Sequence, residues 1–221
     1  MKRRALLAAA ITLASTTEAD AQACLGRAAF SSGAVRTSIG YQSVNWYGGE
    51  IAVGSAQSGF GAARFETYQP GHSSSASTFS STRMLVSGGT QVRVGRAQFC
   101  PIAGLGHANS ESSFDSRRLE STVRRYEIGG AIGTSTGARD DVHVIPSLAI
   151  KYVLESASGT ITTAGIPSRF NNRGTSHGES VWSLGFAYGS VAVTPFVVAP
   201  FGIRFLRTDW GVHVSYNFGR R

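Results

Sequence analysis

The sequence predicts an all-β fold, an antiparallel up-and-down transmembrane β-barrel, and three observations lead to this prediction. Large apolar and small polar residues alternate along much of the chain, with the period of two that strands have. Glycine is abundant, at 27 of 221 residues, whereas charged residues make up only 15%, against roughly 25% in soluble domains. After residue 23, no apolar run approaches the ~18 residues of a spanning helix, which excludes a helical membrane protein.

The amino terminus has the features of a secretory leader. Three basic residues follow the initiating methionine, and residues 5–14 form an apolar run that is too short to cross a bilayer. The polar stretch that follows ends in Ala21-x-Ala23, which fits the small-x-small cleavage pattern. We therefore predict a cleaved signal peptide at residues 1–23 and a single barrel domain at residues 24–221.

The mature chain is basic. Removing the leader takes away three basic and two acidic residues, so the net charge becomes (21 − 3) − (13 − 2) = +7. A basic exported protein favours acidic partners such as lipid phosphates, and arginine forks suit the phosphates of lipopolysaccharide. Arginines near the predicted external rim are Arg117, Arg118, Arg124, Arg169, Arg173, Arg204 and Arg207. A solvated rim without a partner is the alternative, and no nucleic-acid motif is present.

The chain has two cysteines, Cys24 and Cys100. Export places them in an oxidising compartment, where a pair of cysteines predicts one disulfide. The alternative is a lipidated Cys24 at the mature amino terminus. That modification normally needs a large apolar residue three positions earlier, and this position holds Ala21.

Ten segments have the alternation and the bounding turn residues of strands. They cover residues 34–42, 46–54, 59–68, 83–95, 98–107, 122–133, 142–154, 179–189, 191–202 and 209–218. Ser-, Thr-, Asn- and Gly-rich stretches at 69–82, 108–121 and 155–178 predict long loops, all on one side. Short periplasmic turns and long external loops are typical of bacterial outer-membrane barrels. We expect ten strands, with eight as the alternative if the first hairpin is absent, in the cell outer membrane.

The two faces of these segments differ in side-chain size. In the last segment Trp210, Val212, Val214, Tyr216 and Phe218 alternate with glycine, histidine, serine and asparagine. The polar face is too small and too poor in charge for the solvated outside of a soluble sandwich. We therefore expect the small polar residues to line a narrow lumen and the apolar residues to face lipid.

Charged residues on the small-residue face predict a polar lumen. Arg64, Glu66, Arg125, Glu127 and Lys151 carry both signs, so they can neutralise one another inside a barrel. Interiors of about eight strands are just filled by side chains, whereas porins of sixteen or more strands keep a channel. We predict an interior charge network that largely plugs the lumen, with a small passive pore as the alternative.

The carboxyl end carries the most specific motif. Asp209, Gly211, Val214 and Tyr216 give the pattern polar-x-Gly-x-x-apolar-x-aromatic, and Phe218 follows. This resembles the β-signal that the barrel-assembly machinery reads in the last strand of outer-membrane proteins. By pattern, the mature chain resembles the small outer-membrane β-barrel family, the OmpX-like and opacity-type proteins. Such proteins usually end on the aromatic residue, whereas three residues follow Phe218 here.

Two groups of residues have types that occur in barrel enzymes. His107, Ser110 and Glu111 have the types of a lipid A deacylase site, but the spacing is His-x-x-Ser instead of His-x-Ser. Asp140, Asp141 and His143 have the types of an omptin-like protease site, but we expect them at the periplasmic end.

We therefore predict no catalytic residues, no cofactor and no metal site. The function that we expect is a structural or surface-interaction role in the outer membrane. A small passive pore and a soluble periplasmic ligand-binding β-barrel remain the alternatives.

Overall fold

The computed structural model describes residues 34–43, 45–54, 59–68, 78–95, 97–134, 142–202 and 207–218. Their regular elements are strands: β1 (Ala34–Gln42), β2 (Trp46–Gly54), β3 (Gly59–Tyr68), β4 (Thr78–Thr90), β5 (Val92–Val94), β6 (Ala97–Phe114), β7 (Arg117–Thr134), β8 (His143–Thr163), β9 (Ile166–Tyr188), β10 (Val191–Phe201) and β11 (Asp209–Phe218). Among the described residues, no helix has the length and hydrophobicity that a membrane span requires.

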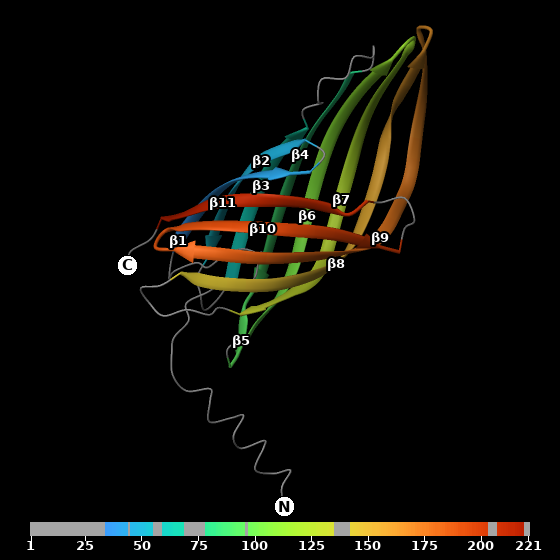
Figure 1. Cartoon of the computed structure of the whole chain (residues 1–221). Coiled ribbons are helices and arrows are strands. Elements are labelled where there is room, and N and C mark those ends of the chain that lie inside the picture. Colours follow the sequence, from blue (N-terminus) through green and yellow to red (C-terminus); the bar gives the residue numbers. More distant parts are fainter. Residues whose placement is uncertain are drawn as a thin grey trace, which may run out of the picture.

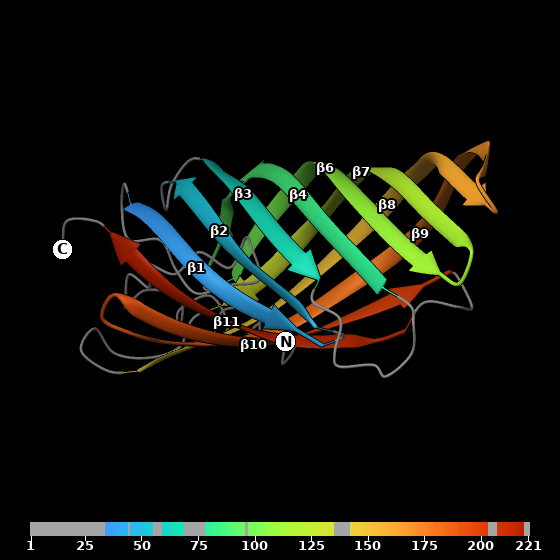
Figure 2. The ribbon, with the colours of Figure 1, turned by 90° about the horizontal axis from the view of Figure 1, so that it is seen from above.

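The strands form one closed antiparallel barrel (Figure 2). The first strand pairs with the last, from Val35 opposite Phe218 to Gln42 opposite Gly211. β4 also pairs with β6, and β5 continues β4 after Gln91 along the same partner. β4 and β5 therefore occupy one strand position, and the barrel has ten strand positions. The prediction of a ten-stranded antiparallel barrel is confirmed, and β1 begins at the same rim at which β11 finishes.

We call the rim near Val35 and Phe218 the terminal rim and the opposite rim the hairpin rim. β1, β2 and β3 have the bounds that the alternation predicts. Alternation is clear in these segments because one side of each carries large apolar residues, such as Ile39, Ile51 and Phe65.

The predicted loops at 108–121 and 155–178 are wrong. These residues extend β6 and β7, and β8 and β9, into two long hairpins with two-residue turns. The predicted loop at 69–82 is also too long, since β4 begins at Thr78. Serine and threonine form strands readily when a neighbouring strand supplies the hydrogen bonds, and threonine favours strands intrinsically. Figure 1 shows the extended ends of β6 to β9 rising beyond the other strands.

The tight turns explain how the hairpins close. Asp115 has a φ of 50°, and Ala164 and Gly165 have φ values of 49° and 84°. Two-residue hairpin turns need such positive φ values, because their twist then matches that of the strands. Glycine at the second position of the β8–β9 turn takes this conformation without a steric cost.

The two faces of the barrel are sorted as the alternation predicts. On β11 Trp210, Val214 and Tyr216 are exposed on the outside, whereas His213 and Ser215 are buried on the inside. β10 is apolar on both faces, and the structure places Val193 and Val197 outside and Ala192 and Thr194 inside.

We predict that Gly211→Ala destabilises the barrel. The ring of Phe196 and the backbone carbonyl oxygen of Tyr41 occupy the space that a Cβ atom at Gly211 would need. The strand backbone cannot move aside freely, so we expect the free energy of unfolding to fall by about 1–3 kcal/mol. Urea unfolding in lipid vesicles measures this change.

Gly61→Ala is the matched control, because the nearest atom lies 4.0 Å from its added Cβ. Equal stability of the two variants would contradict the close packing at Gly211.

Candidate functional site

The candidate functional site is the lumen, and its charged side chains form two clusters. The first lies on the wall made by β1 to β4. Glu50 accepts from Arg36 and from Arg64, both at 3.3 Å. Arg64 also lies 4.0 Å from Glu66, which pairs in turn with Arg83. Glu50 and Glu66 are both buried, so each carboxylate depends on its arginines in place of water.

The second cluster lies on the wall made by β7, β8 and β9. Glu127 accepts from Lys151 at 3.1 Å and from Arg125 at 3.4 Å. Arg125 also donates to Glu155 at 3.0 Å and to Glu179 at 2.7 Å. The Arg125 guanidinium therefore contacts three carboxylates, which suits its planar fork of five N–H donors.

Several of these contacts reach beyond the neighbouring strand. Arg83 on β4 donates to Gln42 on β1 at 3.1 Å, three strands away in the barrel order. Arg125 on β7 reaches Glu179 on β9 over the intervening β8. Both clusters therefore extend into the lumen, each from its own wall.

A cavity of about 410 Å³ lies between the two clusters, and members of both line it. One side is charged, with Glu66, Arg125 and Glu179 among its lining residues, and another is apolar, with Phe196 and Val198. His213 stacks on Phe196 with 4.7 Å between ring centroids, which fixes the apolar side. The described residues contain no group of three or more His, Cys, Asp or Glu side chains that could hold a metal ion.

The five residues of the predicted lumen network lie on the inner face in two groups: Arg64 pairs with Glu66, and Glu127 pairs with Arg125 and Lys151. One network that plugs the lumen stays a prediction. Sequence reasoning missed Arg83, Glu155 and Glu179 as members. Glu179 and Arg83 stand at inward positions of their own strands, so the period of two could have identified them. Glu155 lay in a predicted loop, in which residues do not alternate between an inner and an outer face.

The residue types that occur in barrel enzymes are not brought together. His107 is exposed on the outer face of β6, whereas Ser110 points inward and lies 2.8 Å from the hydroxyl of Ser81. Asp140 and Asp141 lie outside the described residues, and His143 begins β8 at the terminal rim. No hydrolytic couple forms from these residues in the described part of the chain.

The residues of the predicted assembly signal lie along β11, on both of its faces. Val214, Tyr216 and Phe218 face outward and are exposed. Asp209 faces inward and accepts from Gln42 at 3.2 Å, and Gly211 makes room for Phe196.

The described residues include one of the two cysteines and most of the predicted rim arginines. Cys100 is fully buried on the inner face of β6, and Cys24 lies outside the described residues, so the disulfide stays a prediction. Among the rim arginines, Arg117 and Arg169 are exposed on the extended hairpins, and Arg204 lies outside the described residues. Arg118 is engaged by Glu111 at 2.9 Å and by Glu120 at 3.0 Å.

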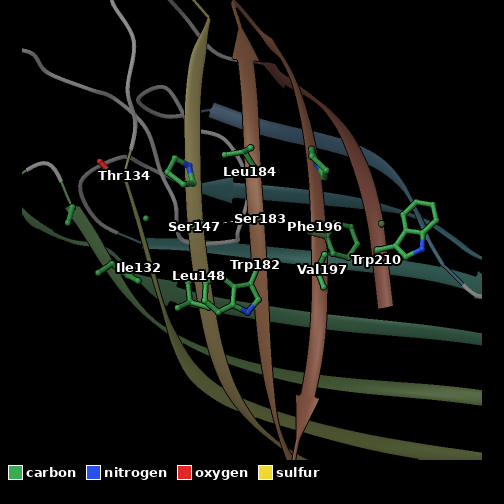
Figure 3. Close-up of a pocket in the computed structure, with 15 residues that line it drawn as sticks. Ile132, Thr134, Ser147, Leu148, Trp182, Ser183, Leu184, Phe196, Val197 and Trp210 are labelled. Carbon is green, nitrogen blue, oxygen red and sulfur yellow. Dashed lines mark hydrogen bonds between the residues drawn. The ribbon is translucent and has the colours of Figure 1, made fainter. Parts of the chain in front are cut away.

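The outer wall carries an apolar groove of about 690 Å³ (Figure 3). Trp182 lies beside Leu148, its partner across the β8–β9 pair, and Trp210 flanks the other side. The pairing of β9 with β10 skips Pro195, which has no N–H to donate. The groove lies beside this gap in the β9–β10 pairing, and its lining is almost entirely apolar.

We predict that Glu127→Gln destabilises the barrel strongly. The substitution keeps the shape of the side chain but removes the negative charge of Glu127, the most buried carboxylate of this cluster. Arg125 and Lys151 both pair with that charge. Breaking a buried pair by removing one partner costs about 3–5 kcal/mol. Urea unfolding in lipid vesicles measures the loss.

Glu111→Gln is the control, because its pair with Arg118 is more than half exposed on both sides and is worth about 0–1 kcal/mol. If both variants lose the same stability, the buried charges contribute no more than surface ones.

No protein-family model and no curated protein sequence matches the chain. Among solved structures, a major outer membrane protein from Thermus thermophilus is similar with a TM-score of 0.36 and 8% identity, covering 84% of this chain and 98% of that one. The KdgM porin in complex with disordered oligogalacturonate gives a TM-score of 0.34 and 10% identity, covering 84% and 99%. The ferric citrate transporter FecA gives 0.26 and 14%, covering 84% and 38%. Similarity of this extent carries no information on substrate or partner.

Proposed function

We propose that the protein is a non-enzymatic outer-membrane β-barrel of the OmpX-like and opacity type. Its role is structural or one of surface interaction, and its lumen is largely closed to free diffusion. The observation that carries the proposal is the pair of ion-paired clusters that extend into the lumen from two walls. If the lumen is closed, the outer wall and the extended hairpins are the surfaces through which the protein contacts lipid or other molecules.

The side chains of the outer wall support insertion of the barrel into a lipid bilayer. Aromatic residues flank the apolar band on β11, with Trp210 at one end and Tyr216 and Phe218 at the other. Eight residue steps at about 3.3 Å, on a strand tilted by roughly 40°, give a band about 20 Å tall. Outer-membrane barrels carry an apolar band of about 25 Å between two aromatic girdles. A soluble periplasmic barrel would leave this wall exposed to water.

The extended hairpins support a role in surface interaction. Their outer face is polar, and it carries the Glu111–Arg118–Glu120 group together with Ser158 and Thr160. Hydroxyl and charged groups of this kind suit the sugar and phosphate groups of lipopolysaccharide. The exposed Arg117 and Arg169 are the arginines best placed for phosphate contacts.

The cavity between the charge clusters favours a second candidate, a small passive pore. Its volume of about 410 Å³ lies in the lumen, and ions would pass through it if the ion pairs of the clusters separated. The barrel-assembly machinery remains the partner expected during biogenesis, because β11 carries the signal residues on a strand that closes the barrel against β1.

We predict that Val214→Arg impairs folding into lipid. Val214 faces outward midway between Trp210 and Phe218. An arginine at the bilayer midplane costs about 2–4 kcal/mol in a barrel. The folded fraction in lipid vesicles, resolved by gel mobility without heating, measures the effect.

Ser158→Arg is the matched control, since it places the same side chain outward on the extension beyond the apolar band. Equal folding of both variants would show that the band does not contact lipid.

We also predict that Arg125→Ala combined with Glu127→Ala raises ion conductance in planar bilayers, while the parent protein conducts little. The pair removes the guanidinium that contacts three carboxylates and the carboxylate that holds Lys151. Arg118→Ala with Glu120→Ala, on the outer face, should leave the conductance unchanged. Large and long-lived openings of the parent would reject the closed lumen in favour of the pore.

A further inference from the structure

The outer face of the sheet made by β4, β6, β7 and β8 changes its chemistry with height, from the apolar band up into the extended hairpins (Figure 1). Residues that pair across these four strands form rows. The row at the top of the apolar band, here called the apolar row, consists of Val86, Leu105, Tyr126 and Leu154, all of them exposed. Each row above lies two residues farther along its strands, which is about 5 Å in height for strands tilted by roughly 40°.

The first row above the apolar row is basic. It consists of Met84, His107, Arg124 and Ser156. Arg124 is exposed, and no carboxylate in the described part of the chain pairs with it. About 5 Å above the hydrocarbon is the level of lipid headgroups, which occupy roughly 5–7 Å on each side of a bilayer. The planar fork of arginine suits phosphate oxygens, so this row matches the phosphate of a lipid.

The next two rows form a polar groove of about 500 Å³. Its outward-facing lining includes Thr82, Asn109, Glu111, Glu120, Thr122 and Thr160. Hydroxyl, amide and carboxylate groups are the donors and acceptors that match sugar hydroxyls. The groove lies about 10–15 Å above the apolar row, beyond the headgroup level of a phospholipid bilayer.

The contacts inside the groove leave hydrogen-bonding groups for a ligand. Thr122 donates to Oδ1 of Asn109 at 3.1 Å, and the amide nitrogen of Asn109 is not used in this bond. Arg118 lies 2.9 Å from Oε1 of Glu111 and 3.0 Å from Oε1 of Glu120, so Oε2 of each carboxylate can accept from a ligand. One arginine between two carboxylates gives a net charge of −1, which favours hydroxyl groups over phosphate in the groove itself.

We propose that this face binds lipopolysaccharide of the surrounding leaflet, with a phosphate at Arg124 and sugar hydroxyls in the groove. The proposal names the partner of the surface-interaction role, and it therefore rests on the proposed function. A phospholipid reaches only the basic row, and a free sugar reaches only the groove. A molecule that carries acyl chains, phosphate and sugars in this order contacts all the levels of the face.

The test uses the full mature protein, folded in detergent micelles, and two probes. One probe is lipopolysaccharide with a complete core, and the other is lipid A, which has the acyl chains and phosphates without the core sugars. Native mass spectrometry measures the affinity for each probe. We expect about tenfold tighter binding of lipopolysaccharide than of lipid A.

Two variants separate the sugar contacts from the phosphate contact. Asn109→Ala combined with Thr122→Val should remove most of the preference for lipopolysaccharide and leave the affinity for lipid A unchanged, because each lost hydrogen bond is worth a few-fold in binding. Arg124→Gln should weaken the binding of both probes by a similar factor.

Asn172→Ala combined with Thr175→Val is the matched control, since it makes the same two changes on the inner face of the extension. This variant should keep the preference. Equal affinity of the parent protein for the two probes, or a preference that survives Asn109→Ala with Thr122→Val, would overturn the inference. Membrane insertion and closure of the lumen are measured separately, by Val214→Arg and by conductance, so the inference and the proposed function can fail independently.

Discussion

The pairing of buried charges inside a closed sheet is the interaction on which this structure depends. Closing the sheet satisfies the backbone of every strand in the barrel, but it also forces each inward side chain into a space about 20 Å wide. Carboxylates such as Glu50 and Glu127 are buried there and contact arginine and lysine side chains. The charged residues therefore stabilise the barrel only as a set, because loss of one member leaves the others without compensation.

This constraint explains the composition of the chain. Large charged residues on two walls need small neighbours, and many other buried residues of the inner face are alanine or serine. Gly211 and Gly89 illustrate the point, since each lies under an aromatic ring that points into the lumen. The outer face has no such limit and carries the large apolar residues. The low fraction of charged residues and the high fraction of glycine thus both follow from the narrow lumen.

The sequence predicts the membrane-height part of the barrel well and the external part poorly. Segments such as β1 and β11 have one mostly apolar face, so their alternation is visible and their bounds are right. Residues 108–121 and 155–178 have polar residues on both faces, so no alternation distinguishes them from loops. Their strand structure depends on pairing with a neighbour and on two tight turns, which are tertiary features. Glu155 was missed as a lumen residue for the same reason.

The most direct measurement of the central claim is the permeability of liposomes that carry the unmodified, oxidised protein. The proposed closure of the lumen by the two charge clusters would exclude a continuous column of water. The account therefore predicts that these liposomes hold a gradient of a small sugar as tightly as liposomes without protein. Rapid swelling in a small sugar, from correctly folded protein, would contradict it.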